Sequence, residues 1–451
     1  MTKKLFGTDG MRGVPRLFPL DEETLAKLGR ALGEYLRAHE PTSEVPGPEV
    51  LLGMDTRESG PWIAEQFSRG LLAAGCSVIS AGVIPTPGVA WLVRQRGFSA
   101  GVVISASHNP FSDNGVKLFS PRGRKFADAV EAEFESGMES QAVTAAPLSV
   151  EIAEQTGLAA EYLDLLRAGK LAGADFSGLR IVLDCANGAA SSLAPNLFRS
   201  LGAEVVAIHN QPNGQNINDN CGSLHPEEMQ ARVVESGAAL GAAFDGDADR
   251  VVLCTGTGRR VDGDGILLGM ARYMRKTGTL KGSTIVGTTM ANLGLERALA
   301  ADELSLTRVP VGDRYVLEEM HRIGANLGGE QSGHIIFLDD ASTGDGMLTA
   351  VKMASLVALT GPLDDLVADL KVFPQTIVNV RVQTRLPLEA TPGVAEEVRR
   401  AEEALGDRGR IVLRYSGTEP LARVMVEGEN EEDVQRWASA IACAIHNAIG
   451  A

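Results

Sequence analysis

The sequence predicts an α/β protein with three related α/β domains, whose sheets are mixed and mostly parallel, and a C-terminal α+β domain. Three observations support this fold class. With 451 residues, the chain exceeds the size at which one hydrophobic core keeps growing, so three or four domains are expected. A unit of strand, polar loop, helix and strand recurs three times, and the last part of the chain follows a different pattern.

Each copy of the repeat begins with a short apolar strand, such as Val50–Met54, that ends in polar residues. A helical pattern follows, and a second strand closes the unit, as at Ser77–Ser80. Such units form right-handed crossovers between parallel strands, with helices covering the sheet. The three copies span residues 50–80, 181–208 and 283–309.

The C-terminal part has a strand at Thr376–Val382, a helix at Thr391–Leu405, two strands around Arg414, and a long helix at Glu431–Ile449. This order predicts a separate α+β layer. We therefore expect four domains. Their predicted limits are residues 1–157, 158–257, 258–371 and 372–451.

The charge balance disfavours nucleic acid as a partner. The chain has 42 Lys and Arg residues against 58 Asp and Glu residues, a net charge of −16. A protein this acidic must concentrate its cations locally if it binds anions.

The five cysteines are far apart, odd in number and without a C-x-x-C pair, so the sequence predicts neither a zinc knuckle nor a disulfide framework. The N-terminus lacks the apolar core of a signal peptide, and no apolar run approaches the roughly 18 residues that span a bilayer. A cytoplasmic protein without a membrane segment is therefore expected.

A turn with two hydroxyls and an imidazole, from Ser105, Ser107 and His108, follows the apolar run Gly101–Ile104. Loops after strand ends are the usual place for chemistry in α/β sheets, and an Asn-Pro pair after the histidine blocks direct continuation into a helix. One of the serines can be a nucleophile or a phosphate carrier. The alternative is a simple Ser/Asn turn with a surface histidine.

Asp245, Asp247 and Asp249 follow the apolar run Ala238–Phe244 at every second position. In a straight strand the outer carboxylates would lie about 13 Å apart, whereas oxygens that share one Mg²⁺ lie within roughly 4 Å of one another. The segment must therefore curl, and Gly246 permits it. A catalytic Mg²⁺ loop is the favoured interpretation, with a structural Ca²⁺ loop and a solvated acidic turn as alternatives. An EF-hand is disfavoured because a strand follows.

A third cluster lies between two strand-like runs near the C-terminus and contains a guanidinium, two hydroxyls and a glycine. These groups can form an anion cradle, to which a nearby arginine adds a charge. A hairpin turn is the alternative. The residues are Arg414, Ser416, Gly417, Thr418 and Arg423.

Together these clusters resemble the α-D-phosphohexomutase superfamily over essentially the whole chain. The runs Val311–Val316 and Pro212–Ser223 are similar to those of the bacterial branch that acts on glucosamine phosphates. Tyr415 departs from the family, in which a small residue or proline is more common there. The matching segments occur in the family's order: Phe6–Gly13, the Ser107 loop, Asp113–Lys117, the Asp245 loop, Gly329–His334 and the Arg414 loop.

The resemblance implies four domains around a central cleft, each supplying one loop. Ser107 would carry a phosphate, with Ser105 as the alternative carrier. One Mg²⁺ would be held against that phosphate by Ser107, Asp245, Asp247 and Asp249. Arg250 and Arg12 would neutralise the phosphoryl oxygens in the transition state.

Lys117 and His108 are the candidates for proton transfer with the sugar hydroxyl and the serine oxygen. Lysine acts as a base only if desolvation or neighbouring positive charge lowers its pKa. The alternative for Lys117 is a phosphate-contacting cation. For His108, positioning of the loop is the favoured role.

The resemblance assigns the sugar hydroxyls to Glu330, Ser332 and His334, and the alternative is an ordinary loop that leads into the strand Ile335–Leu338. The cradle around Arg414 would hold the distal phosphate. The C-terminal domain is expected to move so that a bisphosphate intermediate can turn over.

The implied activity is interconversion of glucosamine 6-phosphate and glucosamine 1-phosphate through a phosphoserine, with hexose 1,6-bisphosphate as activator and intermediate. The product would supply UDP-N-acetylglucosamine and cell-wall biosynthesis. The alternatives are the same chemistry on mannose or glucose phosphates, a sugar-phosphate phosphatase, and a non-catalytic sugar-phosphate-binding regulator. Expected partners are small sugar phosphates, without nucleic acid or membrane, and a homodimer stays open.

Three polar sites have structural interpretations. Asp262 is expected to cap a helix rather than bind metal. Asp55 and Arg57 are expected to form an internal polar pair that shapes the cleft, and Asp345 lies where a helix is expected to begin.

Overall fold

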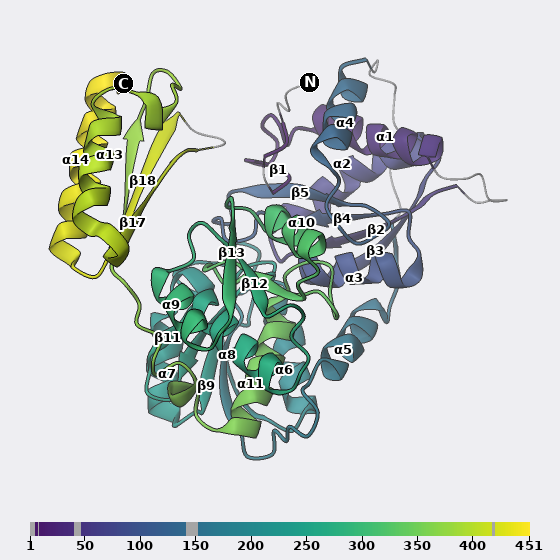
Figure 1. The fold of residues 1–451 in the computed structure, drawn as a ribbon. Helices are drawn as coiled ribbons and strands as arrows, with labels where there is room; N and C mark the ends of the chain where they lie inside the picture. The colour runs from purple at the N-terminus through teal and green to yellow at the C-terminus, as the bar shows by residue number, and fades with distance from the viewer. Residues whose placement is uncertain (1–4, 8, 40–46, 141–151, 417–419) are drawn as a thin grey trace. The chain divides into compact units, whose positions relative to one another are not determined.

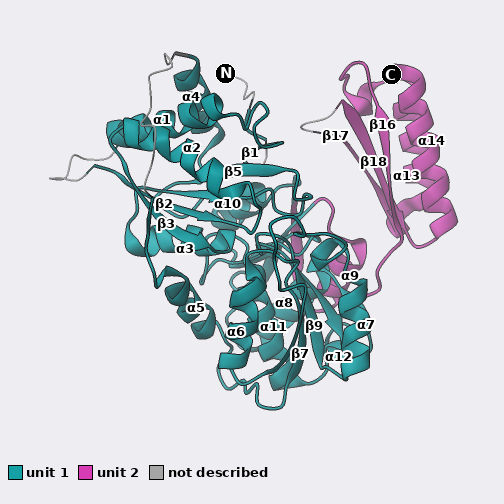
Figure 2. Cartoon of the chain, turned by 180° about the vertical axis from the view of Figure 1, so that it is seen from behind, with its two compact units in different colours: residues 1–288, 309–367 teal, residues 289–308, 368–451 magenta. Residues whose placement is uncertain are grey.

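The computed structural model of the chain describes residues 5–7, 9–39, 47–140, 152–416 and 420–451. It divides into two compact units (Figure 2). Unit 1 comprises residues 1–288 and 309–367, and unit 2 comprises residues 289–308 and 368–451.

The N-terminal part of unit 1 contains, in chain order, β1 (Met11–Gly13), α1 (Glu22–His39), β2 (Glu49–Met54), α2 (Gly60–Ala73), β3 (Ser77–Val83), α3 (Thr86–Arg96), β4 (Ala100–Ile104), β5 (Asn114–Phe119), α4 (Asp128–Ser140) and β6 (Ala153–Glu154). The strands form one sheet in the order β1-β5-β4-β2-β3-β6 (Figure 1). β2 pairs in parallel with β3 and β4, as crossovers through α2 and α3 require, and β5 and β1 add antiparallel pairs at one edge. Leu28 and Leu32 of α1 and Phe67 of α2 share a buried core with Val50 and Val102 of the sheet.

The middle part of unit 1 contains α5 (Leu158–Ala168), β7 (Arg180–Asp184), α6 (Ala190–Ser200), β8 (Glu204–Ile208), the 3-10 helix η1 (Gly222–Leu224), α7 (Glu227–Ser236), β9 (Leu240–Phe244), β10 (Val251–Thr255) and β11 (Arg260–Val261). Its sheet has the order β11-β10-β9-β7-β8. β7 is parallel to β8 and β9, whereas β10 is antiparallel to β9 and β11. The first two copies of the sequence repeat therefore build the same kind of sheet.

The third copy begins after α8 (Gly263–Lys276) and contains β12 (Thr284–Thr288), α9 (Leu293–Ala301), β13 (Ser305–Val309), α10 (Asp313–Ile323), β14 (Leu327–Gly329), β15 (Ile335–Phe337), α11 (Gly346–Thr360) and α12 (Leu363–Leu366). β12 is parallel to β14, and β14 is antiparallel to β15. The predicted caps are confirmed. Asp262 accepts hydrogen bonds from the backbone amides of Asp264 and Gly265 at the start of α8, and Asp345 accepts one from Leu348 at the start of α11.

The C-terminal part of unit 2 contains β16 (Gln375–Arg381), η2 (Leu388–Ala390), α13 (Val394–Leu405), η3 (Gly406–Arg408), β17 (Gly409–Tyr415), β18 (Leu421–Gly428) and α14 (Glu431–Ile449). Its sheet is antiparallel in the order β16-β18-β17, and α13 and α14 cover one face (Figure 2). Val424 and Val426 of β18 pack with Ile441 and Ile445 of α14. This part has its own hydrophobic core, and α14 has the predicted limits.

The predicted fold class is confirmed, and all three α/β sheets are mixed. Each sheet contains a strand that is parallel to the first strand of its repeat and that forms an antiparallel hairpin with the next strand in the chain. The three hairpins are β4–β5, β9–β10 and β14–β15. Their turns carry the Ser107 loop, the Asp245 loop and the Glu330 loop, so the same position of each repeat presents a predicted functional loop. Among the described residues, no helix combines the length and apolar character needed to cross a membrane.

Candidate active site

Ser107 lies in the turn between β4 and β5 with its backbone in the left-handed region, at a φ of 53°. A non-glycine residue adopts this conformation at an energetic cost, and such strain is concentrated at functional sites. The amide of Ser107 donates to the hydroxyl oxygen of Ser105 over 2.9 Å, and that hydroxyl donates to Asp55 over 2.6 Å. The hydroxyl of Ser105 therefore connects the backbone of the loop to Asp55, whereas the side chain of Ser107 points to the aspartates.

The hydroxyl of Ser107 donates a 2.7 Å hydrogen bond to Oδ2 of Asp245. Carboxylate oxygens of Asp245, Asp247 and Asp249 lie within 4.8 Å of one another, so the predicted curl of this segment is present. Oδ1 of Asp247 and Oδ1 of Asp249 are buried without a hydrogen-bond partner. Buried carboxylate oxygens require a partner, and a hard divalent cation suits an all-oxygen set of this kind. The residues present therefore fit a Mg²⁺ ion.

The curl of the metal loop has a different cause from the one predicted. Ala248 adopts a φ of 54° and its amide donates to the carbonyl of Asp245, which closes a turn, while Gly246 has no positive φ. Gly246 is instead required for space. A Cβ atom added there would lie 2.5 Å from the carbonyl oxygen of Ser107.

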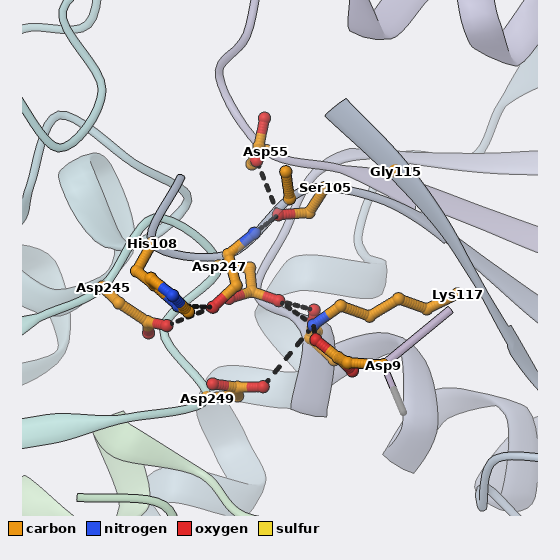
Figure 3. A network of polar contacts seen from close by, with 12 residues as sticks. Asp9, Asp55, Ser105, His108, Gly115, Lys117, Asp245, Asp247 and Asp249 are labelled. Carbon is orange, nitrogen blue, oxygen red and sulfur yellow. Dashed lines mark hydrogen bonds and ion pairs between the residues drawn. The ribbon is translucent and has the colours of Figure 1, made fainter. Parts of the chain in front are cut away.

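Lys117, on β5, is buried among carboxylates (Figure 3). Its Nζ lies 2.8 Å from Oδ2 of Asp247, 3.0 Å from Oδ2 of Asp9 and 3.6 Å from Oδ2 of Asp249. Burial by itself disfavours the ammonium, but these three carboxylates outweigh burial and raise the pKa of Lys117. In this structure Lys117 is a countercharge for the aspartates, and its role as a base stays a prediction.

The carboxylates respond to their surroundings in opposite ways. Burial, followed by the charges of Asp249 and Asp247, raises the pKa of Asp245. For Asp249, burial also acts to raise the pKa, but Lys117, His334 and Arg250 outweigh it and hold the pKa below its usual value. A bound cation would favour the ionised form of all three carboxylates.

His108 lies beside the hydroxyl of Ser107, with Nδ1 at 3.3 Å from Oγ and 3.2 Å from a guanidinium nitrogen of Arg250. Burial, assisted by the positive charges of Arg250 and Arg12, lowers the pKa of His108 to about 4. The imidazole is therefore neutral near pH 7, and its Nδ1 accepts from Arg250. Arg12 donates to the carbonyl of Ala106 over 3.1 Å and so also contacts the serine loop.

The predicted sugar-binding residues lie in the turn between β14 and β15. Glu330 accepts a 3.0 Å hydrogen bond from the amide of Gly312. The hydroxyl of Ser332 lies 3.4 Å from Glu330. His334 is buried, with Nε2 accepting from the amide of Gly344 and Nδ1 at 3.7 Å from Asp249. Its position beside the aspartate links the sugar loop to the metal loop.

The predicted phosphate cradle lies in unit 2. Arg414 on β17 is directly opposite Arg423 on β18, so two guanidinium groups lie side by side across the sheet. Burial and the charge of Arg423 lower the pKa of Arg414. Like charges placed in this way are destabilising unless an anion joins them, which suits a phosphate site. The amide of Ser416 donates to the carbonyl of Leu421, whereas Gly417 and Thr418 lie outside the described residues.

Sequence reasoning missed several residues of the site. Asp9 bonds both Lys117 and Lys125, and the hydroxyl of Thr86 donates to Asp247. Arg57 was expected to form with Asp55 an internal polar pair that shapes the cleft. It pairs with Asp55 at 2.9 Å and also donates to the carbonyl of Ser107 in the serine loop. Position in the sequence was the available signal for this segment, because residues 55–57 directly follow the carboxyl end of the parallel strand β2.

A second group that could hold a metal consists of Asp184, His209 and Cys221. The carboxylate of Asp184 already accepts backbone amide hydrogen bonds from Ala186 and Gly222. Burial raises the pKa of Cys221 to about 12, so its thiol is protonated. In this structure the group forms a polar junction of three loops.

Comparison with known proteins agrees with this architecture. The chain matches the models of the phosphoglucomutase/phosphomannomutase alpha/beta/alpha domains I, II and III at residues 3–144, 135–258 and 262–373. It matches the C-terminal domain of the same family at residues 377–444. All four domains of the family are thus present in order.

Curated relatives match over their whole length. The chain is 49% identical to the phosphoglucosamine mutase of Solibacter usitatus, with 100% of each chain covered. It is also 49% identical to that of Koribacter versatilis, with 99% of this chain and 98% of the relative covered, and 44% identical to that of Shouchella clausii, with 99% and 100% covered.

Solved structures share the fold at lower identity. A phosphoglucomutase/phosphomannomutase family protein from Burkholderia thailandensis has a TM-score of 0.79 at 23% identity, with 99% of this chain and 98% of that chain covered. Aspergillus fumigatus N-acetylphosphoglucosamine mutase, solved with GlcNAc-6P and magnesium, has a TM-score of 0.63 at 17% identity, with 99% and 96% covered. The chain therefore belongs to the phosphoglucomutase/phosphomannomutase family of phosphohexomutases, in the branch of the phosphoglucosamine mutases.

Proposed function

We propose that this protein interconverts glucosamine 6-phosphate and glucosamine 1-phosphate through a phosphate on Ser107 and a hexose 1,6-bisphosphate intermediate. The observation that carries the proposal is the 2.7 Å hydrogen bond from the hydroxyl of Ser107 to Asp245, within a cluster of three buried aspartates. The relatives at 42–49% identity are phosphoglucosamine mutases. In line with the name of these relatives, glucosamine 1-phosphate would enter amino-sugar and cell-wall biosynthesis in the cytoplasm.

The three aspartates would hold Mg²⁺ against the phosphate of Ser107. When bound, this ion would act as a Lewis acid that stabilises charge on the phosphoryl oxygens. Arg250 and Arg12, which flank the serine loop, would neutralise the remaining oxygen charge as the phosphoryl group moves between Ser107 and the sugar.

Neutral His108 would hold Arg250 in place by accepting its N–H, so His108 positions the loop rather than carrying a proton. Lys117 is our proposed partner for the sugar hydroxyl proton. Its raised pKa keeps it protonated in this structure, so it would accept that proton only when a bound cation offsets the neighbouring carboxylates. If Lys117 only contacts phosphate as a cation, Lys117→Arg should leave the pH profile of activity unchanged. If Lys117 is the base, the substitution should change that profile.

Glu330 and Ser332 would accept and donate hydrogen bonds to the sugar hydroxyls, with His334 holding their loop beside Asp249. The distal phosphate would bind Arg414, Ser416, Arg423 and the neighbouring residues Gly417 and Thr418. A bisphosphate would then turn over between the two transfers so that its other phosphate meets Ser107.

The test is turnover of glucosamine 6-phosphate with Mg²⁺ and a trace of glucose 1,6-bisphosphate, followed by phosphorus NMR. Native protein should form glucosamine 1-phosphate and a phosphoserine, Ser107→Ala should form neither, and Ser105→Ala should keep the phosphoserine. Release of inorganic phosphate alone would support a phosphatase instead.

Mannose and glucose phosphates define the second candidate function, because no described residue identifies the C2 substituent. Parallel assays with the three hexose phosphates should give the highest kcat/KM for glucosamine 6-phosphate. Faster turnover of glucose or mannose 1-phosphate would move the protein to the neighbouring branch.

A further inference from the structure

The run Pro212–Ser223, whose sequence is typical of the glucosamine branch, lies against the nucleophile loop. We propose that Asn218 in this run is a positioning residue that holds the Ser107 loop in its reactive conformation, so that the run governs the transfer rate and not the choice of sugar. This inference rests on the proposed function of Ser107 as phosphate carrier.

Two carbonyl groups of the nucleophile loop each accept hydrogen bonds from two side chains. The side-chain amide of Asn218 donates to the carbonyl of Ser107 over 2.8 Å and to the carbonyl of Asn109 over 3.0 Å. The guanidinium of Arg57 donates to the same two carbonyls over 3.1 Å and 2.8 Å. The Ser107–His108 and Asn109–Pro110 peptide groups are thus fixed by two side chains from distant parts of the sequence.

Asn218 has no donor left for a ligand. A carboxamide has two N–H donors, and both are used by the loop carbonyls. A residue that donated a hydrogen bond to a sugar hydroxyl would need a free N–H in contact with the sugar. Its hydrogen bonds therefore assign Asn218 to the loop.

Hydrogen bonds fix the run Pro212–Ser223 to two other loops, so the positions of these loops influence the position of Ser107. The backbone amide of Asn218 donates to the carbonyl of Ala186 over 2.9 Å, which connects the run to the loop after β7. Gly214 accepts from the amide of Glu58, and the side chain of Gln215 donates to the carboxylate of Glu58 over 2.7 Å. These bonds join the run to the segment after β2 that contains Arg57.

The metal loop meets Asn218 at Gly246. A Cβ atom at Gly246 would lie 2.5 Å from the carbonyl oxygen of Ser107 and 2.9 Å from Nδ2 of Asn218. The backbone of the metal loop is therefore packed against the backbone of the nucleophile loop and the side chain of Asn218. Since Ser107 is held at a φ of 53°, loss of these anchors would let the turn relax away from the aspartates.

Asn220 provides a matched control for Asn218. Both asparagines lie in the same run in the left-handed region, with φ values of 50° and 56°. The amide of Asn220 is exposed and donates only to the neighbouring Asp219 among the hydrogen bonds of the described residues. Asn218→Asp replaces the donor by an acceptor that repels the two carbonyls, whereas Asn220→Asp removes a surface hydrogen bond. Asn218→Gly keeps the backbone conformation and removes the side chain.

The experiment measures kcat and KM of the full chain with glucosamine 6-phosphate and glucose 6-phosphate, together with hydrogen exchange of the peptide that contains residues 105–113. Asn218→Asp and Asn218→Gly should lower kcat by about 10- to 100-fold, by the same factor for both sugars, because small misplacements of reacting groups cost this much. KM should change less than about threefold, exchange in the loop should become faster, and Asn220→Asp should behave as the native protein.

An altered preference between the two sugars at unchanged kcat would overturn the proposal, since the run would then determine which sugar the enzyme prefers. Native exchange in the loop of both Asn218 variants would also overturn it. The exchange measurement needs no turnover, so it separates this inference from a failure of the proposed activity, which would appear in the native protein as absence of glucosamine 1-phosphate.

Discussion

Individual residues of the site are held by partners of opposite charge. Lys117 is buried with Asp9, Asp247 and Asp249, an arrangement in which one cation offsets several anions. Removing one partner of a buried ion pair leaves an uncompensated charge and costs more than the pair contributes. In this cluster the uncompensated groups would be the proposed metal ligands.

Lys117→Met is therefore expected to destabilise the protein by about 3–5 kcal/mol in the presence of a chelator. Saturating Mg²⁺ should recover much of this loss, because it binds the native state and neutralises the same carboxylates. Urea unfolding in both conditions measures the difference. Lys27→Met, which breaks a surface pair with Glu23, should cost less than about 1 kcal/mol in either condition. An equal loss for Lys117→Met with and without Mg²⁺ would contradict the prediction.

His209 links the ends of three loops and makes stability depend on pH. Its ring nitrogens lie 3.1 Å from Asp184 and 3.2 Å from Glu228. The contact with Asp184 raises the pKa of His209 above 6.5, against an opposing effect of burial. Because the native pKa exceeds the unfolded one, the stabilisation is complete below pH 6.5 and is lost as the pH rises through the native pKa.

We expect His209→Asn, which tolerates the φ of 45° at this position, to cost about 1 kcal/mol more near pH 6 than near pH 9. Urea unfolding of the native protein and the variant at several pH values gives this difference. A free-energy difference that stays constant over the range would show that the charge of His209 does not contribute.

At the scale of elements, helix caps fix where α8 and α11 begin. Asp262 accepts two backbone amide hydrogen bonds at the start of α8, although its acidic neighbours resemble those of the metal loop. Replacing a capping aspartate by alanine removes acceptors for otherwise unpaired amides, whereas asparagine caps almost equally well.

Asp262→Ala is accordingly expected to lower the free energy of unfolding by about 1 kcal/mol, and Asp262→Asn by much less. Neither variant should change Mg²⁺ affinity, which isothermal titration can measure beside thermal unfolding. Weaker Mg²⁺ binding by Asp262→Asn at unchanged stability would reverse the interpretation and make this residue a ligand.

At the scale of the whole molecule, unit 2 contains a hydrophobic core whose described residues run from Val378 to Ile449. A set of residues with its own core can fold by itself. Contacts such as Arg297 to Glu429 also join this part to residues 289–308 of the same unit. The predicted domain limit at residue 372 lies just before this core and remains a prediction.

The fragment of residues 372–451 is therefore expected to unfold cooperatively, with a free energy of about 3–5 kcal/mol, as followed by circular dichroism in urea. A fragment of residues 391–451 lacks β16, which pairs with β18, and should not fold. Non-cooperative unfolding of the longer fragment would place the domain limit elsewhere.

Much of the architecture could be predicted from local patterns. The three repeats, the C-terminal α+β layer and the limits of α14 follow from hydrophobic periodicity, and the caps Asp262 and Asp345 follow from the side-chain acceptors that helix starts require. The loops with Ser107 and Asp245 were also identified locally, because reactive groups directly after apolar strands indicate the edge of an α/β sheet.

The sequence alone determined which elements form and which loops carry reactive groups, while the tertiary structure decided what those groups contact and hence their charge. Ser107 and Asp245 are 138 residues apart, and Lys117 and Asp247 are 130 apart. The raised pKa of Lys117, the lowered pKa of His108 and the contacts of Asn218 depend on such distant partners and on burial. Local spacing contains no information about these, because electrostatic and hydrogen-bonding energies are set by distances in space.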